Sequence, residues 1–154
     1  MNKFQQLGKV KHINDSILNP SSGGLRLILS LSNLAGEMKC PLYPLFDKKW
    51  RKVKENARGW FVTKNGDYKL GAINTTAVQS DVWVIHMLCQ DEKVNTNIVG
   101  LEKCLKQVSD MAKVEKATVN VSNMLLNLIP ELYNLLDKYM VQNGVSIYLY
   151  EEKK

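Results

Sequence analysis

The sequence has few cysteines, and no two of them stand at a metal-binding spacing. Cys40, Cys89 and Cys104 are an odd number in unrelated contexts, and no Cys-x-x-Cys pair occurs. Neither a disulfide framework nor a structural zinc site is therefore indicated. This pattern of cysteine use is typical of a reducing compartment, so we expect a cytoplasmic protein.

Long apolar runs are also lacking. None approaches the roughly 20 residues that a membrane-spanning helix needs. The start of the chain, Met-Asn-Lys-Phe-Gln-Gln-Leu-Gly-Lys, has no apolar signal-peptide core. We therefore expect no membrane partner. Because no nucleophile elbow or paired metal-ligand spacing occurs either, the sequence predicts no catalytic residue, no metal ligand and no cofactor, and leaves enzymatic activity open.

An extended hairpin lies in the middle of the chain. Residues 70–78 form a Thr-rich segment with one wet face, and residues 82–89 are almost wholly apolar; the turn Gln79-Ser80-Asp81 joins them. The second segment is short and apolar throughout, which favours a strand that is buried on both faces at the centre of a sheet. His86 lies within this strand, so we interpret it as a core histidine.

Strands and helices alternate along the 154 residues, which we assign to a single domain over 1–154. This order predicts an α/β fold with a mostly parallel sheet, and the loops at the carboxyl ends of its strands are the place to look for a ligand. The remaining predicted strands are 9–13, 25–31, 117–122 and 145–150, the predicted helices are 42–57, 99–116 and 130–143, and the predicted irregular segments are 58–67, 90–97 and 123–129.

Much of the formal net charge of +6 comes from one short stretch. Its basic side chains lie on a predicted helix whose other side is apolar. Two interpretations stay open, a solvated helix face and an anion-binding face for nucleic acid, whose phosphates such a face would contact without reading the base sequence. The candidate residues for that face are Lys48, Lys49, Arg51 and Lys52.

Several local strings occur in a familiar order. The first strand ends in Asn14-Asp15, the second ends in Leu31-Ser32-Asn33, Lys69-Leu70-Gly71-Ala72 precedes the apolar strand, and Val145-Ser146-Ile147-Tyr148-Leu149-Tyr150 closes the pattern. With this order of elements, the chain resembles a macro domain, the ADP-ribose-binding module, and is most like small phage and bacterial members and the terminal ADP-ribose glycohydrolases. The resemblance implies a three-layer α/β/α fold with a mixed, mostly parallel sheet.

The resemblance also implies a ligand and the residues that hold it. The ligand would be ADP-ribose, free or on an ADP-ribosylated protein. Asp15 would accept a hydrogen bond from the adenine amino group, Asn33 would contact the distal ribose, and the loop around Gly36 would approach that ribose.

The chain departs from the family in its second phosphate-binding loop. Residues 122–129 contain no glycine, whereas backbone amides cradle a pyrophosphate where side chains leave room. The catalytic Asp of the glycohydrolases has no counterpart there. The alternative is thus a degenerate, phage-encoded macro-like module that binds a host protein or nucleic acid, with an apolar patch at Met124, Leu125 and Leu126 as the partner surface. An ADP-ribosyl hydrolase ranks last.

Overall fold

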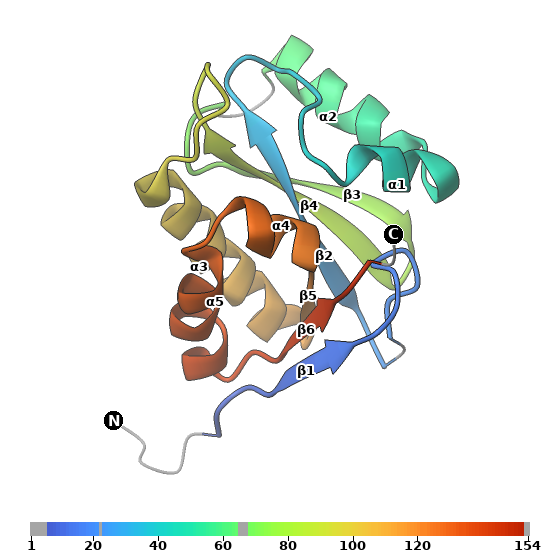
Figure 1. The fold of residues 1–154 in the computed structure, drawn as a ribbon, viewed down its shortest axis with the longest axis vertical. Helices are drawn as coiled ribbons and strands as arrows, with labels where there is room; N and C mark the ends of the chain where they lie inside the picture. Colours follow the sequence, from blue (N-terminus) through green and yellow to red (C-terminus); the bar gives the residue numbers. More distant parts are fainter. Residues whose placement is uncertain (1–5, 22, 65–67, 153–154) are drawn as a thin grey trace.

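A single sheet organises the chain. The computed structural model describes residues 6–21, 23–64 and 68–152. Within these ranges the sheet has six strands in the order β1-β6-β5-β2-β4-β3, and every neighbouring pair is parallel except β3 and β4 (Figure 1). The strands are β1 (Val10–Ile13), β2 (Arg26–Asn33), β3 (Ile73–Gln79), β4 (Val82–Gln90), β5 (Thr118–Ser122) and β6 (Ile147–Tyr150).

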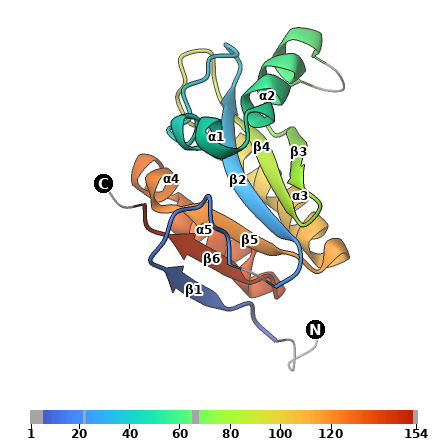
Figure 2. The ribbon, with the colours of Figure 1, turned by 90° about the vertical axis from the view of Figure 1, so that its right-hand side faces the viewer.

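Helices cover both faces of this sheet, which confirms the predicted three-layer α/β/α fold. Figures 1 and 2 show α1 and α2 on one face and α3, α4 and α5 on the other. No helix in the described ranges is both long and apolar enough to cross a membrane. The helices are α1 (Tyr43–Lys49), α2 (Lys52–Thr63), α3 (Ile98–Glu115), α4 (Asn123–Leu128) and α5 (Leu132–Tyr139), followed by a 3₁₀ turn η1 (Val141–Asn143).

The two most apolar strands form the core. All residues of β2 are buried, and so are those of β4 apart from the half-buried Trp83, which confirms the prediction that the apolar strand is covered on both faces. Its predicted place at the centre was wrong, because β2 and β5 occupy the middle and β4 lies next to the edge. The strand on the outer side of β4 is β3, which is Thr-rich and has exposed residues. Such a strand suits the edge of the sheet, so β4 has, in the described chain, only this one strand between it and solvent.

The predicted helix over 42–57 consists of two helices that meet at Trp50 and Arg51. The second, α2, then continues past Gly59 to Thr63, into the segment 58–67 that the sequence predicted to be irregular. Val53, Ala57 and Trp60 are buried, so the apolar stripe goes on past the glycine at helical spacing. Residues 65–67 of that predicted segment lie outside the described residues.

The segment after β5 is also a helix rather than the predicted loop. Ser122 caps α4, since its hydroxyl accepts a hydrogen bond from the amide of Met124 at 3.1 Å. Leu125 and Ile129, four residues apart, are buried in the core. Seven residues are too few to show a helical period, so the apolar content alone did not predict this element.

His86 lies in the core between β4 and the layer of α1 and α2. Its Nε2 is 2.9 Å from the hydroxyl of Thr76, and its Nδ1 has no hydrogen-bond partner among the described residues. Burial lowers the pKa of His86 from 6.5 to about 4, because the charged form loses its hydration. The ring is therefore neutral at pH 7, as expected for a core histidine.

We expect acid to destabilise the protein through this ring. The folded-state pKa lies below the unfolded one, so the unfolded chain binds the proton more tightly and stability falls as the pH drops from 6.5 towards 4. The expected loss between pH 7 and pH 5 is about 2 kcal/mol, measured by urea unfolding at both pH values. In a His86→Gln variant the loss should shrink by that amount; a parallel loss in both proteins would assign the acid sensitivity to other groups.

Candidate functional site

The sheet opens at the carboxyl ends of β2 and β5. In the described chain these strands pair only from Arg26 to Ile28 and from Thr118 to Asn120, while β2 continues to Asn33 and β5 to Ser122. The chain leaves β2 towards β4 and leaves β5 towards β6, so the strand order reverses at this point. A parallel sheet binds ligands at such a switch point, between the loops that follow the two strands.

The loop after β1 carries Asp15 to the same edge of the sheet. Asp15 is exposed, as a contact to a ligand requires. Its carboxylate accepts hydrogen bonds from the amide of Ser16 at 2.7 Å and from the side-chain amide of Asn19 at 3.3 Å. These bonds fix the turn, so Asp15 has a structural role in the loop in addition to any role towards a ligand.

Glu152 links this loop to the start of α4. Its carboxylate accepts hydrogen bonds from the Ser16 hydroxyl and the Ile17 amide, both at 2.6 Å, and its own amide donates to the side chain of Asn123 at 3.2 Å. No local pattern could have predicted the contact, because Glu152 and Ser16 are 136 residues apart.

Asn33 ends β2 and is 2% exposed. Its side-chain amide donates to the carbonyl oxygen of Glu37 at 2.8 Å, and its side-chain oxygen accepts from the Glu37 amide at 3.0 Å. The Tyr68 hydroxyl donates to the Asn33 carbonyl oxygen at 2.7 Å. The side chain therefore closes the loop after β2, and a contact with a ribose would require it to exchange these partners.

Gly36 lies in that loop with a φ of +70°, a conformation that favours glycine. A Cβ at this position would overlap the ring of Phe61 at the end of α2. The Phe61 ring in turn packs edge-on against Tyr68, with 5.5 Å between centroids. The missing side chain thus allows the loop to pack onto α2, whereas the resemblance assigns this glycine to a ligand.

The predicted apolar patch is only partly exposed. Leu125 is buried and Met124 and Leu126 are half-buried, while Leu128, which the prediction did not include, is 50% exposed. Beside α4, at the carboxyl ends of β1 and β6, lies a cavity of about 400 Å³. Its walls include polar side chains suited to a nucleobase, namely those of Asn14, Asn123, Asn127, Tyr133 and Glu151.

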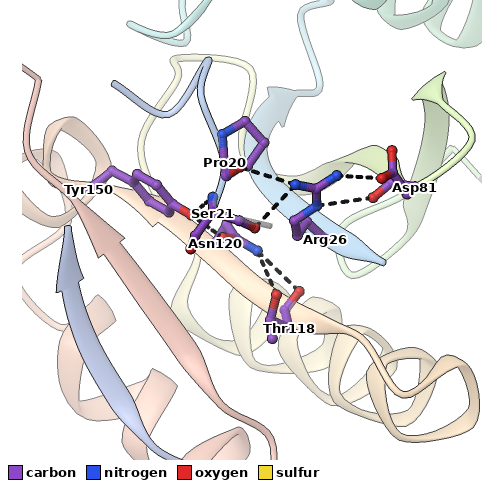
Figure 3. A network of polar contacts seen from close by, with 7 residues as sticks. All are labelled: Pro20, Ser21, Arg26, Asp81, Thr118, Asn120 and Tyr150. Atoms are coloured by element: carbon purple, nitrogen blue, oxygen red, sulfur yellow. Dashed lines mark hydrogen bonds and ion pairs between the residues drawn. The ribbon is translucent and has the colours of Figure 1, made fainter. Parts of the chain in front are cut away.

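A polar network fixes the segment between β1 and β2 to the sheet (Figure 3). The buried guanidinium of Arg26 binds the carboxylate of Asp81 at 2.6 Å and the carbonyl oxygen of Ser21 at 3.1 Å. The Tyr150 hydroxyl donates to the side-chain oxygen of Asn120 at 2.6 Å and accepts from the Ser21 amide at 2.9 Å. The network thus joins β2, β5, β6 and the turn between β3 and β4 to the segment that carries Asp15.

The basic side chains of α1 and α2 are exposed, including Lys48, Lys49, Arg51 and Lys52. Lys49 donates to the carbonyl oxygen of Leu18 at 2.7 Å. A hollow of about 400 Å³ lies on α2. It is lined by Arg51 and by two further basic residues that the prediction did not include, Lys54 and Arg58. Its lining is Asp47, Arg51, Lys54, Glu55 and Arg58.

The three cysteines lie in the core, and burial raises the pKa of each thiol, that of Cys104 to about 12. Protonated, covered thiols are poor nucleophiles. Among the residues described, no group of three or more His, Cys, Asp or Glu side chains is placed to hold a metal ion.

No family model matches the sequence, and no curated protein matches it. Solved structures do. A macrodomain protein from Streptomyces coelicolor superimposes with a TM-score of 0.84 at 20% identity, over 92% of this chain and 98% of that one. The macrodomain of Thermus aquaticus DarG gives 0.69 at 10% identity, over 93% and 98%. Thermosipho africanus DarTG in complex with ADP-ribose gives 0.63 at 14% identity, over 82% of this chain and 38% of that one. The chain therefore has the macrodomain fold, as its resemblance to that family implied.

Proposed function

We propose that this protein binds ADP-ribose or a related nucleotide, free or attached to a protein, at the open carboxyl edge of the sheet. The observation that carries the proposal is the separation of β2 from β5 beyond Ile28, with the loop of Asp15 and the start of α4 beside the opening. Thermosipho africanus DarTG, of which this chain matches 38%, was solved in complex with ADP-ribose, and this supports the choice of ligand.

Each part of such a ligand would meet a different group. The exposed carboxylate of Asp15 is a suitable acceptor for an adenine amino group, and the polar cavity beside α4 has room for a base. The diphosphate would find no glycine-rich cradle, because α4 stands where that loop would be. Asn33 and Gly36 stay candidate ribose contacts, although both also shape the loop after β2. We therefore expect weaker binding than a site with glycine loops would provide.

The test is a calorimetric titration of the wild type and of Asp15→Ala with ADP-ribose at moderate salt. Loss of one hydrogen bond to a charged acceptor costs about 1.5–3 kcal/mol, so we expect the affinity to fall at least about tenfold. Asp110→Ala, which removes an exposed carboxylate from α3, is the matched control and should leave the affinity unchanged. Thermal melting checks that both variants are folded. Absence of heat from the wild type at millimolar ligand would refute the proposal.

A second candidate is nucleic-acid binding through the face of α1 and α2, because Arg51, Lys54 and Arg58 converge on one hollow. Phosphate contacts of this kind weaken steeply with salt and carry no sequence preference. The combined change Lys48→Glu, Arg51→Glu and Arg58→Glu, at three exposed side chains, separates the two functions. It would abolish binding to a single- or double-stranded oligonucleotide and leave the titration with ADP-ribose as in the wild type.

A further inference from the structure

The edge strand β3 has no neighbouring strand on its outer side among the described residues. The amide of Leu88 donates to the carbonyl oxygen of Ala72 at 2.9 Å, so every second residue from Ala72 onward faces β4. The backbone groups of Ile73 and Thr75 therefore face away from the sheet. In agreement, the Thr75 amide is not in the ladder and donates to the side-chain oxygen of Asn74 at 2.7 Å.

Two hollows adjoin this edge at the start of β3. The larger has a volume of about 650 Å³ and lies between the residues that lead into β3 and the exposed side of α3. The smaller, of about 300 Å³, lies between β3 and α2. Trp60 and Asn74 line both hollows, so together they form one groove, which we call the β3 groove. The strands β2 and β4 lie between the β3 groove and the opening between β2 and β5, because β3 is the outermost strand on that side of the sheet (Figure 2).

The β3 groove is cationic at one end. Among the described residues, its larger hollow is lined by Lys103 and Lys106, and by no acidic residue. The stem of Lys103 lies over Gly71, where an added Cβ would approach it to 2.9 Å. The smaller hollow contains one acid, Glu55. A ligand that fills the groove therefore meets positive charge at the amino end of β3.

We propose that the β3 groove binds an extended acidic peptide segment of a partner protein, which adds to β3 as a further strand. The outward backbone groups of Ile73 and Thr75 supply main-chain hydrogen bonds, which give affinity to this mode of binding without depending on the peptide's side chains. The lysine side chains select acidic residues in the segment, and Trp60 provides an apolar wall. Asn74 releases the Thr75 amide when the peptide strand pairs. The inference does not depend on nucleotide binding.

The test is a fluorescence-anisotropy titration at physiological salt with a labelled peptide of alternating Glu and Val. The combined change Lys103→Glu and Lys106→Glu should lower its affinity at least about tenfold. The matched control is Lys48→Glu with Lys49→Glu, which alters net charge equally on another face and should change the affinity less than about twofold. Ile73→Pro removes one outward amide at the first position of an edge strand, where proline is tolerated, and should also weaken binding.

One further probe decides between strand addition and diffuse attraction. The same peptide N-methylated at alternate amides keeps its charge but cannot pair with β3, and it should lose most of its affinity. Equal binding of the methylated and unmodified peptides would overturn the proposal, and so would equal weakening by the two charge reversals. Failure of the wild type to bind the unmodified peptide at millimolar concentration would also overturn it, whatever the outcome with ADP-ribose.

Discussion

Replacing Leu125 by Asp should cost about 4 kcal/mol or more in the free energy of unfolding, which removes most or all of the stability of a domain of this size. Leu125 is 0% exposed in the layer between α4 and the sheet. Truncating such a leucine alone costs about 2–5 kcal/mol, and an unpaired carboxylate in the same place adds its desolvation. Urea unfolding monitored by circular dichroism measures the change.

Leu128→Asp is the matched control for this experiment. It makes the same chemical change in the same helix at a side chain that is 50% exposed, and it should alter stability by no more than about 0.5 kcal/mol. The pair also bears on the predicted partner surface at Met124, Leu125 and Leu126. If Leu125→Asp proves as stable as the wild type, α4 does not hold its place against the sheet and all three side chains become available to a partner. If Leu125→Asp is destabilised as expected, the exposed Leu128 is the position of α4 at which contact with a partner protein should be tested.

Replacing Gly36 by Ala should cost about 3 kcal/mol, from two sources of similar size. A φ of +70° costs an L-residue about 1–2 kcal/mol, and forcing a methyl group into a packed ring costs about 1–3 kcal/mol. The ring is that of Phe61. Gly59→Ala provides the opposite result, since Gly59 is inside α2 with nothing near its Cβ position. That change should stabilise the protein by about 0.5–1 kcal/mol.

A double-mutant cycle separates the two contributions at Gly36. In a Phe61→Ala background the ring is gone, so Gly36→Ala should cost only the backbone part, about 1–2 kcal/mol. An unchanged cost in that background would show that the ring is not the obstacle. The cycle also tests what the glycine is for, because a residue kept for ligand approach would alter ADP-ribose affinity more than stability.

Part of the candidate site could be predicted from the sequence and part could not. Asp15 follows a strand directly, so its exposure at the carboxyl edge follows from local order. The partners of Asn33 and Gly36 come from the loop closure at Glu37 and from Phe61 on α2, and no spacing in the sequence indicates them. Glu152 was missed entirely, because a carboxylate near the end of the chain carries no local signal for the loop that it holds.

The α/β class, the apolar strands that fill the core and the loops at the carboxyl edge of the sheet could all be predicted from the residues alone. These follow from periodicity and turn residues, which act within a few positions along the chain. Only the tertiary structure decided the place of β4 beside the edge, the helical state of 123–128 and the network around Arg26. Leu125 and Ile129 favour a helix because a sheet is present to bury them, and Arg26 is satisfied by Asp81, 55 residues further along the chain. Such contacts contribute free energy only once distant segments have come together, so local sequence cannot predict them.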